Sequence, residues 1–166
     1  MARVKLDRID IRILRDLQEN GRITNVELAR RAGISPPPCL RRVRQLEDAG
    51  CIRGYHAELN PEALGFGVSV FAHVGLHSQA EVDLTAFETL VASWPEVREC
   101  HMLAGEMDFL LRIAAEDWDA YQRFLTTRLT AAPNVRVVKS ALAIRSAKHL
   151  PGVPIELLDA PEAVEG

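Results

Sequence analysis

The sequence predicts an α+β fold in which a helical N-terminal domain is followed by a domain built on an antiparallel sheet. Up to residue 50, apolar side chains recur at helical spacing between helix-capping residues. After residue 50, short patterns follow in the order strand, helix, strand, strand, helix, strand. That order is the split βαβ, or ferredoxin-like, arrangement βαββαβ.

The charge of the chain is divided unevenly between these two parts. The 166 residues have a net charge of −3, but residues 1–60 carry 12 Lys and Arg against 8 Asp and Glu, a balance of +4. Residues 61–166 carry 8 against 15, a balance of −7. A basic half with an acidic remainder is typical of a protein that meets nucleic acid through its basic end.

Capping residues mark the first two helices. Asp7 predicts the start of the first one. Thr24, followed three residues later by Glu27, is a capping box, so a second helix should begin at Asn25. Gly33 can adopt the left-handed conformation that ends it. The inward-facing apolar residues of the two helices are Ile13, Leu14, Leu17, Val26, Leu28, Ala29 and Ala32.

A third helix is predicted from Pro36, with the Ser35 side chain as its cap. The short connection after the second helix is that of a helix-turn-helix. At about 100° per residue the third helix divides into two sides. Its inner side holds Cys39, Leu40, Val43 and Leu46.

The outer side of the third helix has the composition of a DNA reader. Arginine offers a planar donor fork to guanine or phosphate, and a helix N-terminus adds a positive partial charge. Asp48 lies towards the far end, so the N-terminal half should enter the major groove. For each arginine taken singly, an ordinary solvated helix face is the alternative. The candidate DNA contacts are Ser35, Pro37, Arg41, Arg42, Arg44 and Gln45.

We expect the helical domain to occupy residues 1–52, a linker strand and connector residues 53–66, the sheet domain residues 67–150, and a weakly ordered tail residues 151–166. The linker strand would pair with the same strand of a second chain, because an isolated edge strand is a liability. The elements expected in the sheet domain are strands at Val68–Leu76, Val97–Ala104, Phe109–Ala114 and Val135–Ile144, with helices from Glu81 to about Ser93 and from the Asp117 cap to about Leu129.

Two of these strands are apolar at successive positions, which indicates that both faces of the sheet need cover. The two helices can cover only one face. The same face of a second chain would cover the other, so we predict a symmetric homodimer. The residues that indicate this are Val70, Phe71, Ala72, Phe109, Leu110 and Leu111.

The cysteines and the hydropathy pattern indicate a cytoplasmic protein. Cys39, Cys51 and Cys100 have neither zinc spacing nor a CxxC pair, so we expect them to be reduced and mostly buried. No apolar run approaches the roughly 20 residues of a membrane span. No secretory leader is visible at the N-terminus.

Metal and enzyme functions have little support. His73 and His77 share one strand face and lie near Cys100 and His101 on a neighbouring strand, but their spacing matches no standard zinc pattern. We therefore predict no metal and no other cofactor. No nucleophile with its base is identifiable, so we expect no enzyme activity.

With both halves in view, the chain resembles the Lrp/AsnC, or feast/famine, family of transcription regulators. The resemblance runs from Leu6 to about Lys148 and is carried by LDRIDIRILRDLQENGRITNVELARRAGIS, CLRRVRQLEDAGCIRGYHAELNPEALG and GEMDFLLRI. It implies a winged helix-turn-helix, a linker strand used in dimerisation, and a ferredoxin-like regulatory domain that responds to amino acids. Dimers in that family often assemble into tetramers or octamers. The chain departs from the family at Pro36–Pro38, where relatives commonly place a small polar residue, so any base contact there would be apolar.

The resemblance also implies an amino-acid effector site at an interface between subunits. The turn from Gly105 would receive a carboxylate, and Asp108 would hold the ammonium group. A plain hairpin is the alternative. His101 and Trp118 are larger than the aliphatic residues of leucine-responsive relatives, which leaves leucine in doubt and admits an aromatic or charged effector. The implied effector residues are His101, Gly105, Glu106, Met107, Asp108, Trp118 and Ser140.

The predicted function is a sequence-specific DNA-binding transcriptional regulator whose oligomeric state or DNA affinity is modulated by a small amino acid. Its partners would be double-stranded DNA, the amino acid and further copies of the chain, with no membrane. The alternative is a stand-alone amino-acid-sensing module without specific DNA binding. The basic N-terminal half favours the regulator.

Overall fold

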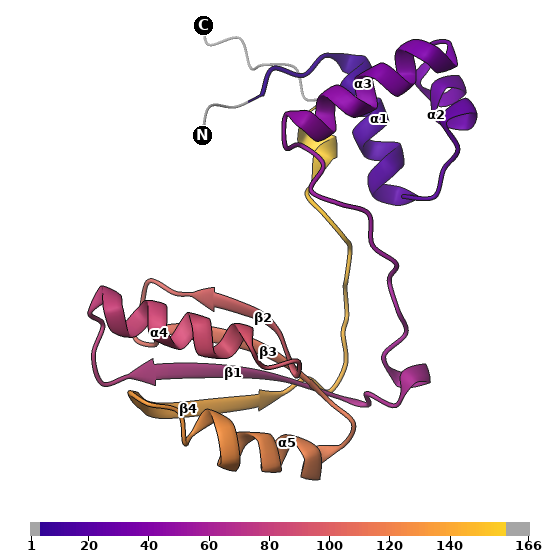
Figure 1. Ribbon diagram of the computed structural model, residues 1–166. Coiled ribbons are helices and arrows are strands. Elements are labelled where there is room, and N and C mark those ends of the chain that lie inside the picture. Colours follow the sequence, from indigo (N-terminus) through magenta and orange to yellow (C-terminus); the bar gives the residue numbers. More distant parts are fainter. Residues whose placement is uncertain (1–3, 159–166) are drawn as a thin grey trace, which may run out of the picture. The chain divides into compact units, whose positions relative to one another are not determined.

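The computed structural model describes residues 4–158, and the chain forms two compact units (Figure 1). The first unit holds the chain up to Glu58 together with the chain from Lys148. The second holds Leu59–Ala147. Among the described residues, no helix is both long and apolar enough to cross a membrane.

The first unit is built on three helices, α1 (Arg8–Glu19), α2 (Asn25–Ala32) and α3 (Pro36–Asp48). Asp7 caps α1 with a complete capping box, since its side chain accepts two amides of the first turn and Asp10 reaches back to its amide. α2 begins at the predicted residue and ends at Gly33, whose φ of 74° is left-handed. These starts and stops confirm the predicted helix-turn-helix.

The core of the helical unit uses a narrower stripe of α2 and α3 than the apolar pattern predicts. Val26 is 67% exposed and Leu40 is 41% exposed, although both were predicted to face inward. At 100° per residue each lies at the edge of its buried stripe rather than within it. Cys51 is half-buried and Cys100 is exposed, so the expectation of mostly buried cysteines is also wrong. The buried core residues are Ile13, Leu28, Ala29, Ala32, Cys39 and Leu46.

A C-terminal segment completes the first unit, which the sequence did not predict. The short helix η3 (Ile155–Leu158) lies against α1, and Ile155 is buried. The Gln18 amide donates to the Val153 carbonyl (2.8 Å) and accepts from the Val153 amide (2.9 Å). The expected weak order of the tail is therefore wrong for its described part, while residues 159–166 lie outside the described residues.

The segment that follows α3 is extended and forms no strand within one described chain, so its pairing with a second copy stays a prediction. A strand needs a hydrogen-bonded neighbour, and none is present in a single copy. Tyr55 anchors the start of this segment, because its hydroxyl donates to Glu47 (2.9 Å) and its ring lies beside Gly21. A short 3-10 turn, η1 (Glu62–Leu64), leads into the second unit.

The second unit is a four-stranded antiparallel sheet of β1 (Val68–Leu76), β2 (Val97–Met102), β3 (Phe109–Ala115) and β4 (Val135–Leu142). The strand order is β2-β3-β1-β4. This order confirms the ferredoxin-like βαββαβ topology. β2 and β4 end slightly before the predicted residues.

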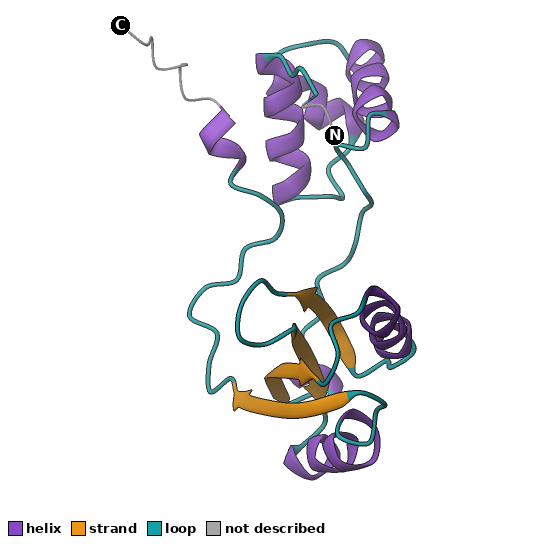
Figure 2. Ribbon diagram, turned by 90° about the vertical axis from the view of Figure 1, so that its left-hand side faces the viewer, coloured by secondary structure: helices purple, strands orange, loops and turns teal. Residues whose placement is uncertain are grey.

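Both helices of the second unit lie on one side of the sheet (Figure 2). They are α4 (Glu81–Ala92) and α5 (Trp118–Phe124), and a π-helical turn extends α5 to Leu129. Asp117 caps α5 as predicted, accepting the Ala120 amide (2.7 Å).

The helices bury only one face of the sheet. On the other face, Phe71 is 36% exposed and Leu110 is half-buried. A single copy therefore leaves the second face without cover, as the apolar pattern indicated. The buried residues of β1 and β3 are Val70, Ala72, Val74, Leu76, Phe109, Leu111, Ile113 and Ala115.

Candidate DNA-binding surface and effector site

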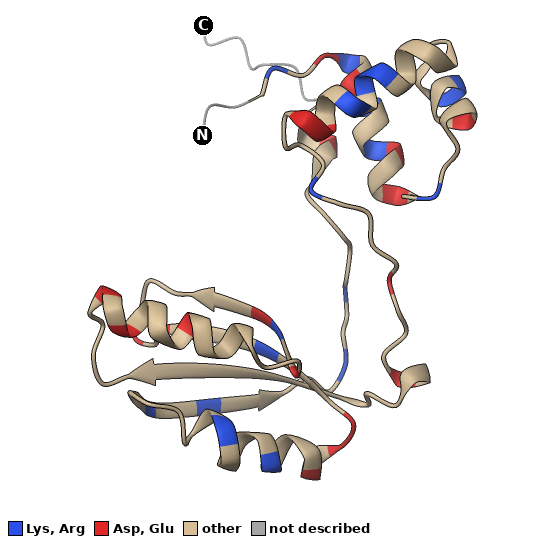
Figure 3. Ribbon diagram, in the orientation of Figure 1, with Lys and Arg blue, Asp and Glu red and all other residues tan. Residues whose placement is uncertain are grey.

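The outer side of α3 is exposed, because the inner side packs into the helical core against α1 and α2. Basic residues follow one another along α3, with acidic residues at its C-terminal end (Figure 3). This distribution would place the N-terminal half of α3, rather than its end, against a polyanion. The predicted DNA contacts that are exposed are Ser35, Pro37, Arg41, Arg44 and Gln45.

Ser35 occupies the N-cap position of α3, but its side chain caps nothing. The next three residues, Pro36, Pro37 and Pro38, have no amide hydrogen to donate. The first amide of the helix, that of Cys39, is bonded to the Ser35 carbonyl (3.2 Å). The predicted side-chain cap is therefore wrong, and the start of α3 presents no free amide to a phosphate.

Arg42 differs from its neighbours because it is bound within the unit. Its guanidinium donates to Asp7 (2.8 Å) and Asp10 (2.7 Å), and its side chain is 27% exposed. The Asp10 amide, assisted by the Arg42 guanidinium, lowers the pKa of the Asp7 carboxyl. Arg42 thus ties the outer helix α3 to the start of α1.

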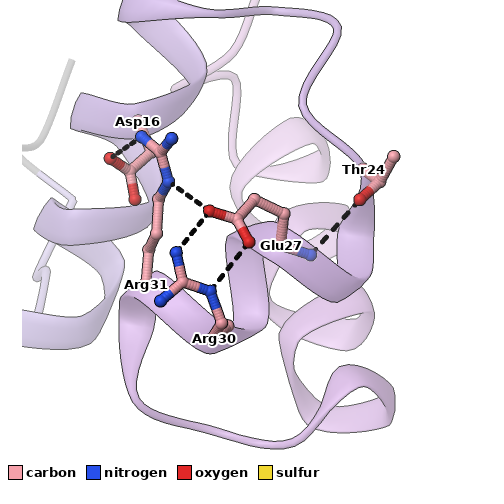
Figure 4. A network of polar contacts seen from close by, with 5 residues as sticks. All are labelled: Asp16, Thr24, Glu27, Arg30 and Arg31. Atoms are coloured by element: carbon pink, nitrogen blue, oxygen red, sulfur yellow. Dashed lines mark hydrogen bonds and ion pairs between the residues drawn. The ribbon is translucent and has the colours of Figure 1, made fainter.

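A second charged network, which the sequence analysis missed, lies on α2 (Figure 4). The Glu27 carboxylate accepts from Arg30 (2.6 and 2.8 Å) and from Arg31 (2.9 Å). These bonds, those of Arg30 first, lower the pKa of Glu27 to about 2. Arg31 also lies 3.6 Å from Asp16 of α1. Arg30 and Arg31 follow Glu27 by three and four residues, and this spacing was the sequence signal that could have revealed the network.

The same network leaves the predicted capping box of α2 half formed. The Thr24 hydroxyl accepts the Glu27 amide (3.3 Å), as predicted. The Glu27 carboxylate binds the two arginines of its own helix instead of the Thr24 amide. Charge-assisted bonds to arginine are stronger than a bond to a neutral amide, which explains the difference.

In the second unit, Asp108 has a structural bond. Its carboxylate accepts the Leu76 amide (2.6 Å), and its own amide donates to the Val74 carbonyl (2.9 Å). Gly105 has no positive φ, and a Cβ there would meet no atom within 4 Å. The turn therefore does not require glycine at position 105. The Asp108 carboxylate has a structural role, because it holds the hairpin to β1 through the Leu76 amide.

Two further residues of the turn face different surroundings. Met107 is buried beside Gly75, while Glu106 is exposed and pairs with Lys139 (3.1 Å). Only the open, solvent-facing part of the turn is therefore available to a small polar ligand.

The remaining predicted effector residues form separate contacts. The Trp118 ring lies 5.3 Å from that of Tyr121, whose hydroxyl is hydrogen-bonded to Ser140. His101 lies 3.3 Å from a Glu99 carboxylate oxygen and on the open face of the sheet. Trp118 itself is 44% exposed.

One copy of the chain does not bring all of these residues together. The Gly105–Asp108 turn lies at the Val74–Leu76 end of β1, whereas Trp118 follows Ala115, which pairs with Val68 at the other end. Seven residues of β3 separate the two ends, about 20 Å at strand spacing. A site that uses both groups must draw them from two copies.

The histidines considered for a metal site are also apart. β3 lies between β1 and β2, so Leu110 separates His73 from His101, and the prediction that their strands are neighbours is wrong. Cys100 pairs with the buried Leu111 and lies on the opposite face from His101. Among the described residues, no group of three or more His, Cys, Asp or Glu is placed to hold a metal ion.

Two family models match the two units. Residues 6–53 match a winged helix-turn-helix DNA-binding model, and residues 69–153 match the Lrp/AsnC ligand binding domain. Together with the exposed recognition helix, they define a DNA-binding transcriptional regulator with a separate ligand-binding domain. The chain belongs to the Lrp/AsnC family of transcriptional regulators.

Curated relatives match over most of both lengths. The leucine-responsive regulatory protein of Rhizobium meliloti is 55% identical over 148 residues, which are 89% of this chain and 95% of the relative. The Bkd operon transcriptional regulator of Pseudomonas aeruginosa is 44% identical over 142 residues, 86% of this chain and 93% of the relative.

Solved structures agree. A transcriptional regulator from Neisseria meningitidis in complex with L-Met superposes with a TM-score of 0.88 at 42% identity, covering 93% of this chain and 99% of that one. An AsnC family regulator from Agrobacterium tumefaciens gives a TM-score of 0.86 at 35% identity, covering 92% and 99%.

Proposed function

We propose that two copies of this regulator bind one operator, with their α3 helices in major-groove faces about one helical turn apart. The exposed side of α3 supplies the contacts to bases and phosphates. The residues proposed for these contacts are Ser35, Pro37, Arg41, Arg44 and Gln45.

The contrast between Arg41 and Arg42 carries this proposal. Arg41 is exposed, whereas Arg42 binds Asp7 and Asp10. The ion pairs of Arg42 fix α3 against α1, and Arg41 beside it stays on the exposed side of the helix. Arg42, predicted as a DNA contact, is therefore reassigned as the residue that holds α3 in place for Arg41.

Gel shifts at several salt concentrations test this proposal, with a duplex from the region upstream of the protein's own gene. Arg41→Ala should weaken specific binding by about 1 to 3 kcal/mol if Arg41 reads a base, and should reduce the salt slope if it binds phosphate. Arg123→Ala, an equivalent change on the exposed side of α5, is the control and should leave affinity unchanged. Absence of DNA affinity at low salt would favour the stand-alone sensing module.

We further propose that the open face of the sheet and the extended segment after α3 are dimer contacts. The open face carries Phe71 and Leu110, and the segment has no strand partner in one copy. In a symmetric dimer the second copy would cover the open face and provide a strand partner for the segment. Sedimentation at micromolar concentration should give a dimer or a multiple of it, such as a tetramer or octamer, and a monomer would contradict this step.

The effector proposal is an amino acid bound near the Gly105–Asp108 turn at a subunit interface. Its support is the separation of this turn from Trp118 in one copy, together with the L-Met complex of the Neisseria relative. His101 before the turn and Glu106 within it are exposed and would contribute polar contacts. The buried Met107 would anchor the turn to the sheet. The amino acid would favour one assembly geometry and so change the spacing of the α3 helices or the oligomer population.

Asp108→Asn separates the ligand role of Asp108 from its structural role. Asparagine keeps an oxygen for the Leu76 amide but loses the charge that an ammonium group needs. Calorimetric titration with individual amino acids, L-Met first, should show loss of binding by the variant while its melting temperature stays close to that of the wild type. Retained binding would refute the ammonium role.

A further inference from the structure

The start of α3 is apolar as well as free of amide donors. Pro36 and Pro37 are exposed, and Leu40 is 41% exposed. Leu40 lies four residues after Pro36 and three after Pro37, so its side chain adjoins both prolines on the helix surface. These three residues are referred to as the apolar patch.

Pro37 lies on the same side of α3 as the exposed arginines, and Leu40 adjoins it, four residues before Arg44. Arg41 and Arg44 follow Pro37 at four and seven residues, which is the spacing of one helix side. The Asn25 side chain donates to the Pro36 carbonyl (2.9 Å), which fixes the patch relative to α2. The part of the helix that would enter a groove first is therefore apolar and held in place.

The chemistry of the major groove limits what such a patch can contact favourably. Proline and leucine side chains have no donor or acceptor, so they cannot bond the donors and acceptors that guanine, cytosine and adenine present there. Covering a polar edge without replacing its bonds to water costs free energy. Thymine alone presents an apolar group, its C5 methyl, whose burial is favourable.

We propose that the apolar patch reads thymine methyl groups and so selects A·T base pairs opposite the start of α3. This inference rests on the proposed DNA-binding function. Two effects favour thymine over the other bases. Its methyl group gains an apolar contact, whereas the donors and acceptors of the other bases lose bonds to water that the patch does not replace. Arg41 and Arg44, further along the helix, make the polar contacts that the patch cannot make.

Replacement of thymine by uracil in the operator tests the proposal, because it removes the methyl group and keeps every hydrogen-bonding group. The full-length protein would first select its preferred duplexes from a random library at fixed salt. Each thymine of an enriched duplex would then be replaced singly. We expect a loss of about three- to fivefold in affinity per methyl group, at one or two thymines in each half-site.

Pro37→Ser assigns the effect to the patch. Serine is accepted in the first turn of a helix, and a melting curve would verify that the variant folds. At the thymines facing the patch, the variant should lose its response to uracil, while other thymines behave as in the wild type. Arg41→Ala is the matched control, which should lower overall affinity and keep the uracil response.

The outcomes are distinct. If no duplex is enriched, the proposed DNA-binding function fails. If duplexes are enriched but uracil has no effect at any thymine, or has the same effect on Pro37→Ser as on the wild type, only the assignment of thymine reading to the patch is overturned.

Discussion

The Arg42 guanidinium of α3 lies 2.7 Å from the Asp10 carboxylate of α1, and this ion pair joins the proposed DNA-reading helix to the first helix of the chain. Arg42→Ala should lower the free energy of unfolding of the first unit by about 1 to 2 kcal/mol, because it removes charge-assisted bonds to two aspartates. Urea denaturation followed by circular dichroism measures this loss.

Arg41→Ala is the matched control, since Arg41 is exposed on the same helix. Its effect on stability should stay within about 0.5 kcal/mol, whereas its effect on DNA affinity should be large. Equal destabilisation by the two variants would contradict the positioning role of Arg42.

The Glu27 network predicts a dependence of stability on acid. Arg30 and Arg31 hold the folded pKa of Glu27 at about 2, below its ordinary value of 4.5. The contribution of the network is therefore fully present above pH 4.5 and is lost as the pH falls towards 2. Between these values the wild type should lose stability more steeply than Glu27→Gln, as measured by urea midpoints. Parallel curves would show that the network does not persist in solution.

Asp108 predicts two different outcomes for two substitutions. Asp108→Ala leaves the amide of the buried Leu76 without its acceptor and should destabilise the second unit by about 1 to 3 kcal/mol. Asp108→Asn keeps an acceptor and should retain most of the stability. Thermal denaturation of both variants without ligand makes the comparison, and equal melting temperatures would show that the Leu76 bond contributes nothing.

Gly152 predicts a specific release of the C-terminal segment. Its φ is 78°, and a Cβ there would lie 2.0 Å from the Gln18 side-chain oxygen that accepts the Val153 amide. Gly152→Ala should therefore break this bond and increase hydrogen exchange at Val153. Gly65→Ala is the control, because Gly65 also has a positive φ of 86° but open space around it.

The Gly65 variant should bear only the backbone strain of a left-handed alanine, about 1 to 2 kcal/mol, and leave exchange at Val153 unchanged. If Gly152→Ala also leaves that exchange unchanged, the Gln18 clamp is not formed in solution.

Local signals predicted much of the fold because they are decided within a few residues. The Asp7 and Asp117 caps and the Gly33 stop were correct, as was the first strand, Val68–Leu76. The ferredoxin-like topology also followed from the succession of elements, because few topologies accommodate it, although the neighbour assumed for the strand of His73 was wrong.

The errors arose where a competing partner decided the outcome. Ser35 failed as a cap because the amides it would accept belong to prolines. Sequence spacing also could not show that Arg42 binds two aspartates, which are distant from it in the chain. Periodicity alone could not show how wide the buried stripe of a helix is, which explains the exposure of Val26 and Leu40.

The candidate effector site was predicted only as a set of residues. Sequence spacing could not show that Asp108 binds the Leu76 amide or that Trp118 follows the opposite end of the sheet. Both facts depend on strand register, which pairs residues far apart in the chain.

The C-terminal segment on α1 also decides where the chain can be cut. An expression fragment that stops at the end of the helix-turn-helix would lack Ile155 and Val153, leaving their apolar and polar partners on α1 bare. The smallest fragment that keeps all contacts of the first unit therefore consists of two separate parts of the sequence. A single-chain version would need the segment from Lys148 to Leu158 grafted back through a flexible spacer.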